Sequence, residues 1–188
     1  EHGPDWNRLI RCTITLNRVN NAAGTGPSVD GSRCIEVTNA IPTAATTALT
    51  VTAATGSNSN NRFYANTCQN SNVGIALTGF ADTTPFANAD AGNDIGGASL
   101  ATGNIVKNFG GGAATNPAAG IRCTAQYGVN ISYNTVNNND GAGVNHATTL
   151  RGIFNNTAVS ASATITNNTV TVKSGATTSL LTAIDNVA

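Results

Sequence analysis

The amino-acid sequence predicts an all-β protein whose short strands stack into a parallel β-solenoid of about five coils. Composition is the first reason: 27 Asn, 28 Thr and 20 Gly among 188 residues favour turns and exposed strand faces over helices. An apolar fraction of 40% is the second, because it supplies a core and argues against general disorder. The third is a recurring pattern of an apolar residue, two spacers, Asn, one spacer and another apolar residue.

The Asn pattern predicts the corners of the coils. Ile131 and Val136 end one copy of the pattern, and both are expected to face the core although they are five positions apart. The chain must therefore bend between them. Asn tolerates the left-handed backbone of a sharp corner, and its amide can bond the equivalent amide one coil away. We predict a corner ladder with five members: Asn17, Asn66, Asn104, Asn134 and Asn168.

A second pattern alternates with the first and predicts the core. Each copy has a small residue, then Ile, a spacer and often another apolar residue. Stacking of the copies in successive coils is expected to form a core ladder. Its members are Ile35, Ile75, Ile121, Ile153 and Ile184. In the first coil, alternation in LIRCTITL predicts that Ile10, Cys12, Ile14 and Leu16 point inward.

We predict a single domain over residues 1–188, with the surplus of the uneven repeats in loops rich in Gly, Ala and Thr. The longest predicted insertion between coils is 81–99. The absence of Met predicts that the chain is a segment of a longer protein.

Several stretches carry a resemblance to known repeat proteins. GIRCTAQYGVNISYNTVNN, ATTLRGIF and ATITNNTVTV resemble the right-handed parallel β-helix of the pectin-lyase-like superfamily. NDIGG, GNIVKNFGGGAATN and GVNHATTLRGIFNNTA resemble segments of long surface proteins that some Gram-negative bacteria export by the type IX secretion route. The resemblance covers the chain from Arg62 onward and the first sixty residues only loosely. It implies right-handed coils, an extracellular or cell-surface location and an adhesive or unassigned role, without a catalytic motif to transfer.

Polysaccharide-cleaving members of that superfamily need paired carboxylates, or a carboxylate-bound calcium with a basic residue. The densest acidic stretch here carries Asp82, Asp90 and Asp94, which we consider as a calcium or sugar loop. The alternative, a solvated turn, is preferred. His146 has Arg151 five residues later, but a polar loop residue is the preferred interpretation, so no catalytic residue and no other metal site are predicted.

Pairs of Thr flanking one β-branched residue raise a different function. Stacked at about 4.8 Å per coil, two outward hydroxyls per strand could form a flat ice-binding face. The alternative is that Thr is a good exposed strand residue. The pairs are Thr13 and Thr15, Thr50 and Thr52, Thr164 and Thr166, and Thr169 and Thr171.

The four cysteines do not impose a disulfide framework. Cys68 and Cys123 occupy positions that hold Val or Leu in other copies of the repeat, which predicts buried apolar roles. Cys12–Cys34, within the first coil, is the one bridge considered.

The leading functional hypothesis is a non-enzymatic structural or adhesive β-helix segment of a secreted or cell-surface bacterial protein, with filament formation as one form of that role. Its partners are expected to be neighbouring coils or capping domains of the same or like chains, because the end strands would otherwise expose their edges. A protein that binds or cleaves surface polysaccharide is the alternative, and ice binding the second. Nine basic and nine acidic residues give no footprint for nucleic acid, and no stretch has the ~20 apolar residues of a membrane span.

Overall fold

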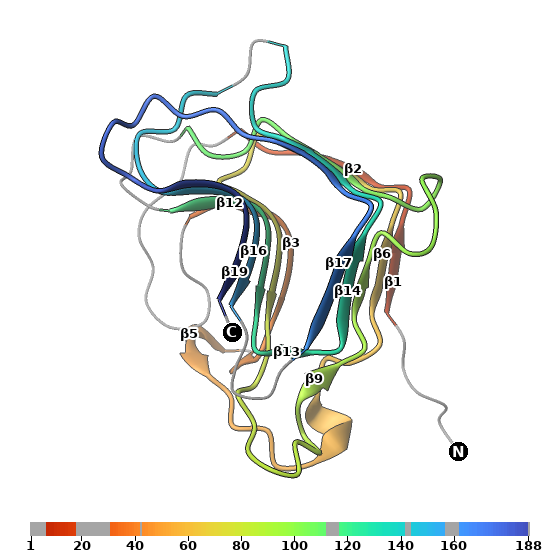
Figure 1. Ribbon diagram of the computed structural model, residues 1–188. Coiled ribbons are helices and arrows are strands. Elements are labelled where there is room, and N and C mark those ends of the chain that lie inside the picture. Colours follow the sequence, from red (N-terminus) through yellow and green to blue (C-terminus); the bar gives the residue numbers. More distant parts are fainter. Residues whose placement is uncertain are drawn as a thin grey trace.

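The protein is a parallel β-helix of five coils, each contributing one strand to each of three five-stranded parallel sheets (Figure 1). The computed structural model describes residues 7–17, 31–41, 43–111, 117–141, 144–156 and 162–187. Sheet A contains, from coil 1 to coil 5, β1 (Arg8–Ile10), β6 (Arg62–Tyr64), β10 (Asp94–Ile95), β14 (Val129–Ser132) and β17 (Ala163–Thr166). Sheet B contains β2 (Thr13–Thr15), β7 (Thr67–Gln69), β11 (Ile105–Lys107), β15 (Thr135–Asn137) and β18 (Thr169–Thr171). Sheet C contains β3 (Arg33–Thr38), β8 (Val73–Thr78), β12 (Ala118–Thr124), β16 (Leu150–Asn156) and β19 (Leu181–Val187).

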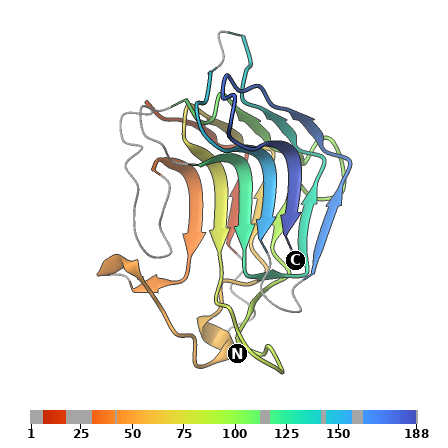
Figure 2. The same ribbon diagram turned by 60° about the vertical axis from the view of Figure 1, so that its left-hand side comes forward.

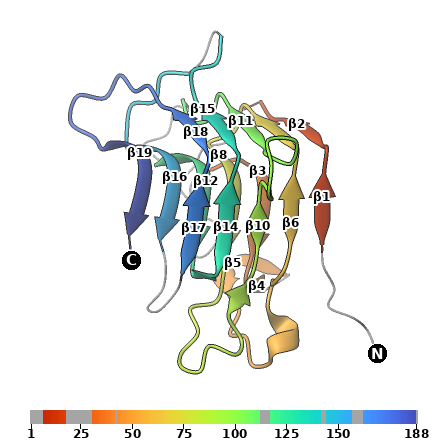
Figure 3. The same cartoon turned by 45° about the vertical axis from the view of Figure 1, so that its right-hand side comes forward.

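The coils are right-handed. In Figure 1 the chain runs up sheet A, across sheet B and down sheet C, which is counter-clockwise. Figures 2 and 3 turn the molecule in opposite directions, and the C-terminal coil then lies at opposite sides of the picture, so this coil faces the viewer in Figure 1. A path that turns counter-clockwise while approaching the viewer is a right-handed helix, as the family resemblance implied.

Side chains in register form the core as columns that run along the helix axis. Sheet A supplies Phe63, Ile95 and Ile131, which are buried and stack in successive coils. Sheet B supplies a second column, and sheet C a third, and the three columns converge in one cluster. Because the strands are only two to seven residues long, no strand could bury its apolar face alone, and stacking supplies the cover.

The second sequence pattern corresponds to the main column of sheet C. The structure pairs its members in series, as Ile35, Ile75, Ile121, Ile153 and Ile184. The three in the middle coils are fully buried, whereas Ile184, on the last coil, is 46% exposed.

The corner between sheets A and B holds an amide ladder of Asn66, Asn104, Asn134 and Asn168. The side-chain oxygens of Asn104, Asn134 and Asn168 each accept two hydrogen bonds from the Asn one coil earlier, from its backbone N–H and from its Nδ2, at 2.9 to 3.0 Å. The same Nδ2 also donates to the carbonyl of the inward-facing residue of the sheet A strand in the previous coil. The bonds between asparagines therefore have a direction, since each Asn donates to the Asn of the next coil and accepts with its side-chain oxygen from the previous coil.

The left-handed residue of this corner precedes the ladder position. Ala65, Tyr133 and Asn167 have φ of 55°, 58° and 55°, while the ladder asparagines that follow them do not have positive φ. The expectation that the ladder Asn itself adopts left-handed geometry was therefore wrong by one residue. The amide is retained for its hydrogen bonds.

Asn17 does not belong to the ladder, which corrects the prediction for coil 1. Leu9 pairs with Phe63 and Ile14 with Cys68, so the ladder position of coil 1 is Cys12. The backbone N–H of Cys12 donates to Asn66 Oδ1 at 3.0 Å, and Asn17 is exposed.

The inward set predicted from LIRCTITL also changes. Arg11 has a φ of 57° and forms the bend. Leu9 and Ile14 therefore pack against the core from opposite sides of the corner, and Ile10 pairs with the outward Tyr64.

The predicted insertion 81–99 is narrower in the structure. Residues 90–95 inside it form β9 (Asp90–Ala91), which pairs with β13 (Gln126–Tyr127), and the sheet A strand β10. An antiparallel pair, β4 (Ala40–Ile41) and β5 (Ala44–Ala48), and a short 3-10 helix, η1 (Ala54–Gly56), complete the described elements. No helix in the described ranges is long and apolar enough to cross a membrane.

Candidate functional site

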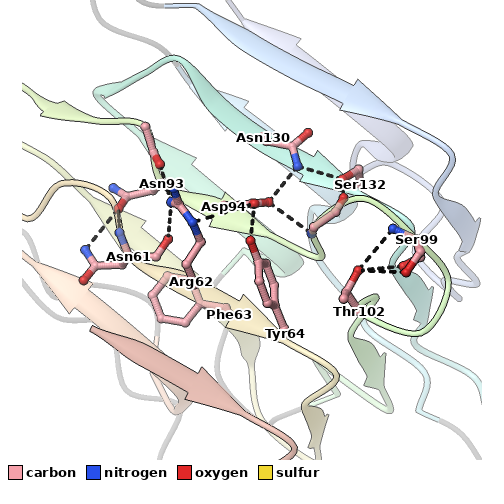
Figure 4. A network of polar contacts seen from close by, with 12 residues as sticks. Asn61, Arg62, Phe63, Tyr64, Asn93, Asp94, Ser99, Thr102, Asn130 and Ser132 are labelled. Atoms are coloured by element: carbon pink, nitrogen blue, oxygen red, sulfur yellow. Dashed lines mark hydrogen bonds and ion pairs between the residues drawn. The ribbon is translucent and has the colours of Figure 1, made fainter. Parts of the chain in front are cut away.

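The outer face of sheet A carries a cluster of polar side chains centred on Asp94 (Figure 4). Alternation positions them: Arg62 and Tyr64 flank the inward Phe63, so they point outward. Strand pairing then aligns Arg62, Asp94 and Asn130 across three successive coils. These residues are far apart in the sequence and adjacent only because the coils stack in register.

Asp94 accepts hydrogen bonds on both carboxylate oxygens. The Tyr64 hydroxyl donates to Oδ2 at 2.5 Å, and Asn130 Nδ2 donates to Oδ1 at 2.6 Å. The backbone N–H of Gly97 also donates to Oδ1, at 3.0 Å, and Arg62 Nε lies 4.0 Å from Oδ2. Three hydrogen-bond donors and one ion pair hold the carboxylate in a fixed orientation on the outer face.

Burial, and after it the hydrogen bond to Asp94, raises the pKa of Tyr64 to about 12. The phenol therefore stays protonated at neutral pH and acts as a hydrogen-bond donor rather than as a base. Next to it, the Ser132 hydroxyl donates to the carbonyl of Gly97, and Asn130 Nδ2 reaches Ser132 Oγ at 2.7 Å. The face thus offers hydroxyl, amide and guanidinium groups next to one oriented carboxylate.

The outer face of sheet A has one carboxylate among its polar groups. Cleavage of a glycosidic bond by acid–base chemistry requires two carboxylates flanking the bond. The five strands of sheet A, all of which the structure describes, contain one carboxylate, Asp94. The polar groups of this face repeat along the axis at about 4.8 Å, the spacing of the strands.

The three aspartates of the predicted calcium or sugar loop lie in three different surroundings. Asp82 accepts the backbone N–H groups of Thr83 and Asn88, both at 2.8 Å, and so closes its own loop. Asp90 is buried, and Asp94 is on the outer face of sheet A. Among the described residues no group of three His, Cys, Asp or Glu could hold a metal ion, and the three aspartates considered as a calcium or sugar loop do not come together.

Asp90 belongs to a second polar network, directly before the sheet A strands β6 and β10, which the sequence patterns did not predict. Its Oδ1 accepts Asn39 Nδ2 at 2.9 Å and the backbone N–H of Asn58 at 3.0 Å. Burial raises its pKa above the ordinary value.

Beside Asp90, buried amides again bridge coils. Asn61 donates to Asn93 Oδ1 through its backbone N–H at 2.8 Å, and Asn93 Nδ2 donates to Gln126 Oε1 at 2.7 Å. The sequence signal was an Asn directly before the sheet A strands of coils 2 and 3, as in NRFY and NDI.

His146 is a buried structural residue. Its Nδ1 accepts the backbone N–H of Gly111 at 3.1 Å, which leaves the ring proton on Nε2. Nε2 lies 2.8 Å from the Thr148 hydroxyl, and Ser174 Oγ donates to the His146 carbonyl at 2.8 Å. These contacts order the loop before β16.

The Thr pairs do not stack into one array. Thr13 and Thr15 lie on β2 and Thr169 and Thr171 on β18, at opposite edges of sheet B, with Ile105 and Lys107 of β11 between them. The pair Thr164 and Thr166 is on sheet A, and the pair Thr50 and Thr52 is outside the strands. On sheet B the first outward column has Thr in every coil except coil 3, where it has Ile105, and the second column has Thr only in coils 1 and 5. Paired hydroxyls therefore occur on sheet B only in its two edge strands.

All four cysteines are free, so the bridge considered between Cys12 and Cys34 is not present. Cys68 and Cys123 are fully buried. The Cys12 thiol is 3.7 Å from the carbonyl of Ile10, whereas the Cys34 thiol is 3.3 Å from Ser71 Oγ in the next coil. The two thiols therefore have different neighbours.

Comparisons with known proteins return no family model, no curated protein and no solved structure that matches this chain. The resemblances to pectin-lyase-like and type IX surface proteins gain no support from them. Function has to be inferred from the geometry of the coils.

Proposed function

We propose that this chain is a non-enzymatic structural module of a secreted or cell-surface bacterial protein, in which stacked β-helix coils form an elongated scaffold with an adhesive outer face. The observation that carries the proposal is the state of the end coils. Leu181 and Ile184 on the last coil are 45% and 46% exposed, although their partners one coil earlier, Leu150 and Ile153, are fully buried.

The first coil supports the same proposal. Leu9, Ile14 and Val37 are only partly buried, whereas their partners in coil 2, Phe63, Cys68 and Leu77, are buried. At both ends the outermost strands also carry backbone N–H and C=O groups on their free edges. A neighbouring coil, or a capping domain of the same or a like chain, would cover the apolar columns and pair those groups.

Association through the end coils tests the proposal. Sedimentation velocity over a range of concentrations is expected to show elongated assemblies, and Ile184→Lys is expected to shift them toward the monomer. Thr182→Lys is the matched control, since Thr182 is on the same strand in register with Arg151, whose side chain lies on the outer face beside Phe154. A chain that is monomeric at every concentration, or an equal response of the two variants, would contradict stacking.

Polysaccharide binding on sheet A is the second candidate function, and the Asp94 cluster favours it. Tyr64, Asp94 and Asn130 present oriented polar groups along the axis, which is the geometry that an extended sugar chain requires. Titration with acidic and neutral polysaccharides is expected to show binding that Asp94→Asn weakens at least tenfold. Lys107→Gln on sheet B should leave binding unchanged. Release of reducing ends would contradict a pure binding role.

A further inference from the structure

Two columns of side chains meet inside the β-helix, where sheet B leads into sheet C. One column is the residue directly before each core isoleucine, and it is Gly in coils 2, 3 and 4. The other is the middle residue of each sheet B strand, which is Val in coils 3, 4 and 5. Each Gly faces the Val of the following coil.

The space between these columns explains the glycines. A Cβ added to Gly74 would lie 2.2 Å from Val106 Cγ1, and one added to Gly120 would lie 2.3 Å from Val136 Cγ1. At Gly152 the corresponding distance to the Val170 Cγ1 atom is 2.2 Å. These separations are far below van der Waals contact. At each contact between the two columns there is therefore room for one side chain but not for two.

The contact between coil 1 and coil 2 differs from the others in both columns. The residue before Ile35 is Cys34 instead of Gly, and the residue that it faces in coil 2 is Cys68 instead of Val. Both thiols are free in the structure. The Cys34 thiol lies 3.3 Å from Ser71 Oγ and 3.6 Å from the carbonyl of Gln69, the residue after Cys68. A disulfide would place two bonded sulfur atoms where the other coils hold a single Val side chain.

The distance between Cβ positions of the two columns is close to that in a disulfide. The ideal Cβ position at Gly74 is 3.4 Å from Val106 Cβ. Disulfides join Cβ atoms about 3.5 to 4.5 Å apart. The Cβ–Cβ distance of the equivalent pair one coil later is therefore close to the distance that a disulfide needs.

We propose that Cys34 and Cys68 form a disulfide that joins coil 1 to coil 2 when a small-molecule disulfide such as oxidised glutathione is the oxidant. The Cys34 thiolate attacks one glutathione sulfur, which forms a mixed disulfide and releases one glutathione. Cys68 loses its proton and attacks the Cys34 sulfur, which forms the protein disulfide and releases the second glutathione. The two protein thiols are oxidised, and the two released glutathiones carry the electrons and protons.

The environments of the two thiols assign these roles. The hydrogen bond from Cys68, aided by Ser71 and opposed by burial, lowers the pKa of Cys34 to about 7. The same hydrogen bond and burial raise the pKa of Cys68. Cys34 is partly exposed and Cys68 is fully buried, so Cys34 is the thiol that meets the oxidant and Cys68 the one that completes the bridge.

Tryptic mapping without reductant tests the connectivity, because every cysteine lies in a different tryptic peptide. The peptides are 12–18, 34–62, 63–107 and 123–151. After the folded chain is equilibrated with oxidised glutathione, 34–62 is expected to be linked to 63–107. Linkage of 12–18 to 34–62, or four unlinked peptides, would overturn the proposal.

Thermal unfolding tests the effect of the bridge. Oxidation is expected to raise the midpoint by roughly 5 to 10 °C, because the bridge restricts the unfolded chain. The double substitution Cys34→Gly and Cys68→Val restores the pairing of the other coils, and its midpoint should not depend on oxidant. Cys123→Ala, which removes a buried cysteine of coil 3, should keep the full oxidant response. Loss of the response in Cys123→Ala, or its persistence in the double variant, would contradict the assignment.

Discussion

Coils 4 and 5 contain the same kinds of side chain at the same positions but differ in burial. Ile153 is 0% exposed and its partner Ile184 is 46% exposed, and Leu150 and Leu181 differ in the same way, at 0% and 45%. Residue type and strand position are constant in this comparison. The difference arises because coil 4 has a neighbour on both sides and coil 5 on one side. The burial of a core side chain in this protein therefore depends on whether a further coil covers it, and not on the type of residue.

Hydrogen bonding repeats the comparison. Asn134 Oδ1 accepts two bonds from Asn104, and Asn134 donates two bonds to Asn168. Asn168 also accepts two bonds, from Asn134. Its Nδ2 donates to the Ile131 carbonyl, but the described chain has no further coil whose Asn could accept a bond from it. A substitution made in both coils therefore measures what the missing neighbour contributes.

The largest difference is expected for the core isoleucines. Ile153→Ala should lower the free energy of unfolding by about 3 to 4 kcal/mol, since it leaves a cavity among side chains that cannot collapse. Ile184→Ala should cost about 1 kcal/mol, because the residue is half exposed. Urea unfolding followed by circular dichroism gives both values. Equal losses would mean that coil 5 is covered in solution.

The amide ladder should show the next largest difference. Asn134→Ala removes the acceptor of two bonds and leaves the buried N–H of Asn104 unpaired, so a loss of about 2 to 3 kcal/mol is expected. Asn168→Ala removes the same acceptor for the Asn134 N–H but at a partly exposed site, with a loss of about 1 kcal/mol. Amide hydrogen exchange at residues 104 and 134 provides a second measurement. If Asn104 stays protected in Asn134→Ala, another acceptor replaces the amide oxygen.

The glycine column should respond less. Gly120→Ala places a Cβ 2.3 Å from Val136 Cγ1, and the resulting overpacking should lower the free energy of unfolding by about 1 to 2 kcal/mol. In coil 5 the equivalent residue is already Ala183, and Ala183→Gly should cost under ~1 kcal/mol through chain entropy. Val136→Ala in combination with Gly120→Ala should recover part of the loss. No recovery in the double variant would locate the strain elsewhere.

The smallest effect is expected for the pH dependence that the buried carboxyl of Asp90 causes. Because burial raises the pKa of Asp90 above 3.8, the native carboxyl keeps its proton to higher pH than the unfolded one. The native state then binds more protons, so the stabilisation is complete below pH ~4 and is lost as pH rises through the native pKa. Asp90→Asn keeps an acceptor for Asn39 and Asn58 and should flatten this part of the curve. Unfolding free energies measured between pH 3 and 8 will show an unchanged slope if Asp90 is not responsible.

The fold was predictable from Asn66 onward because the pattern there is local. Short-range spacing places an apolar residue, an Asn and another apolar residue in every coil, and the stacked copies then pair. In coil 1 the ladder position is Cys12, whereas the Asn pattern predicts Asn17, five residues later, which is exposed. Because coil 1 has Cys where coils 2 to 5 have Asn, the pattern places the predicted ladder residue of coil 1 five positions too late.

The polar site was less predictable because its members come from three coils separated by loops of unequal length. Proximity in the sequence grouped Asp94 with Asp82 and Asp90, although the structure places the three apart. Its true partners, Tyr64 and Asn130, become visible only when strands are aligned by register. The same alignment brings Cys34 opposite Cys68, which spacing alone had not shown.

The direction of the amide ladder has a consequence for how the molecule acquires its shape. An N-terminal coil displays unused donors, and the coil that follows it brings the oxygen that accepts them. Each finished turn is thus a template for the turn that emerges later from the ribosome. At coil 1 the donor is the backbone N–H of Cys12, which Asn66 Oδ1 of coil 2 accepts. Winding can proceed vectorially, in the order in which the polypeptide is delivered.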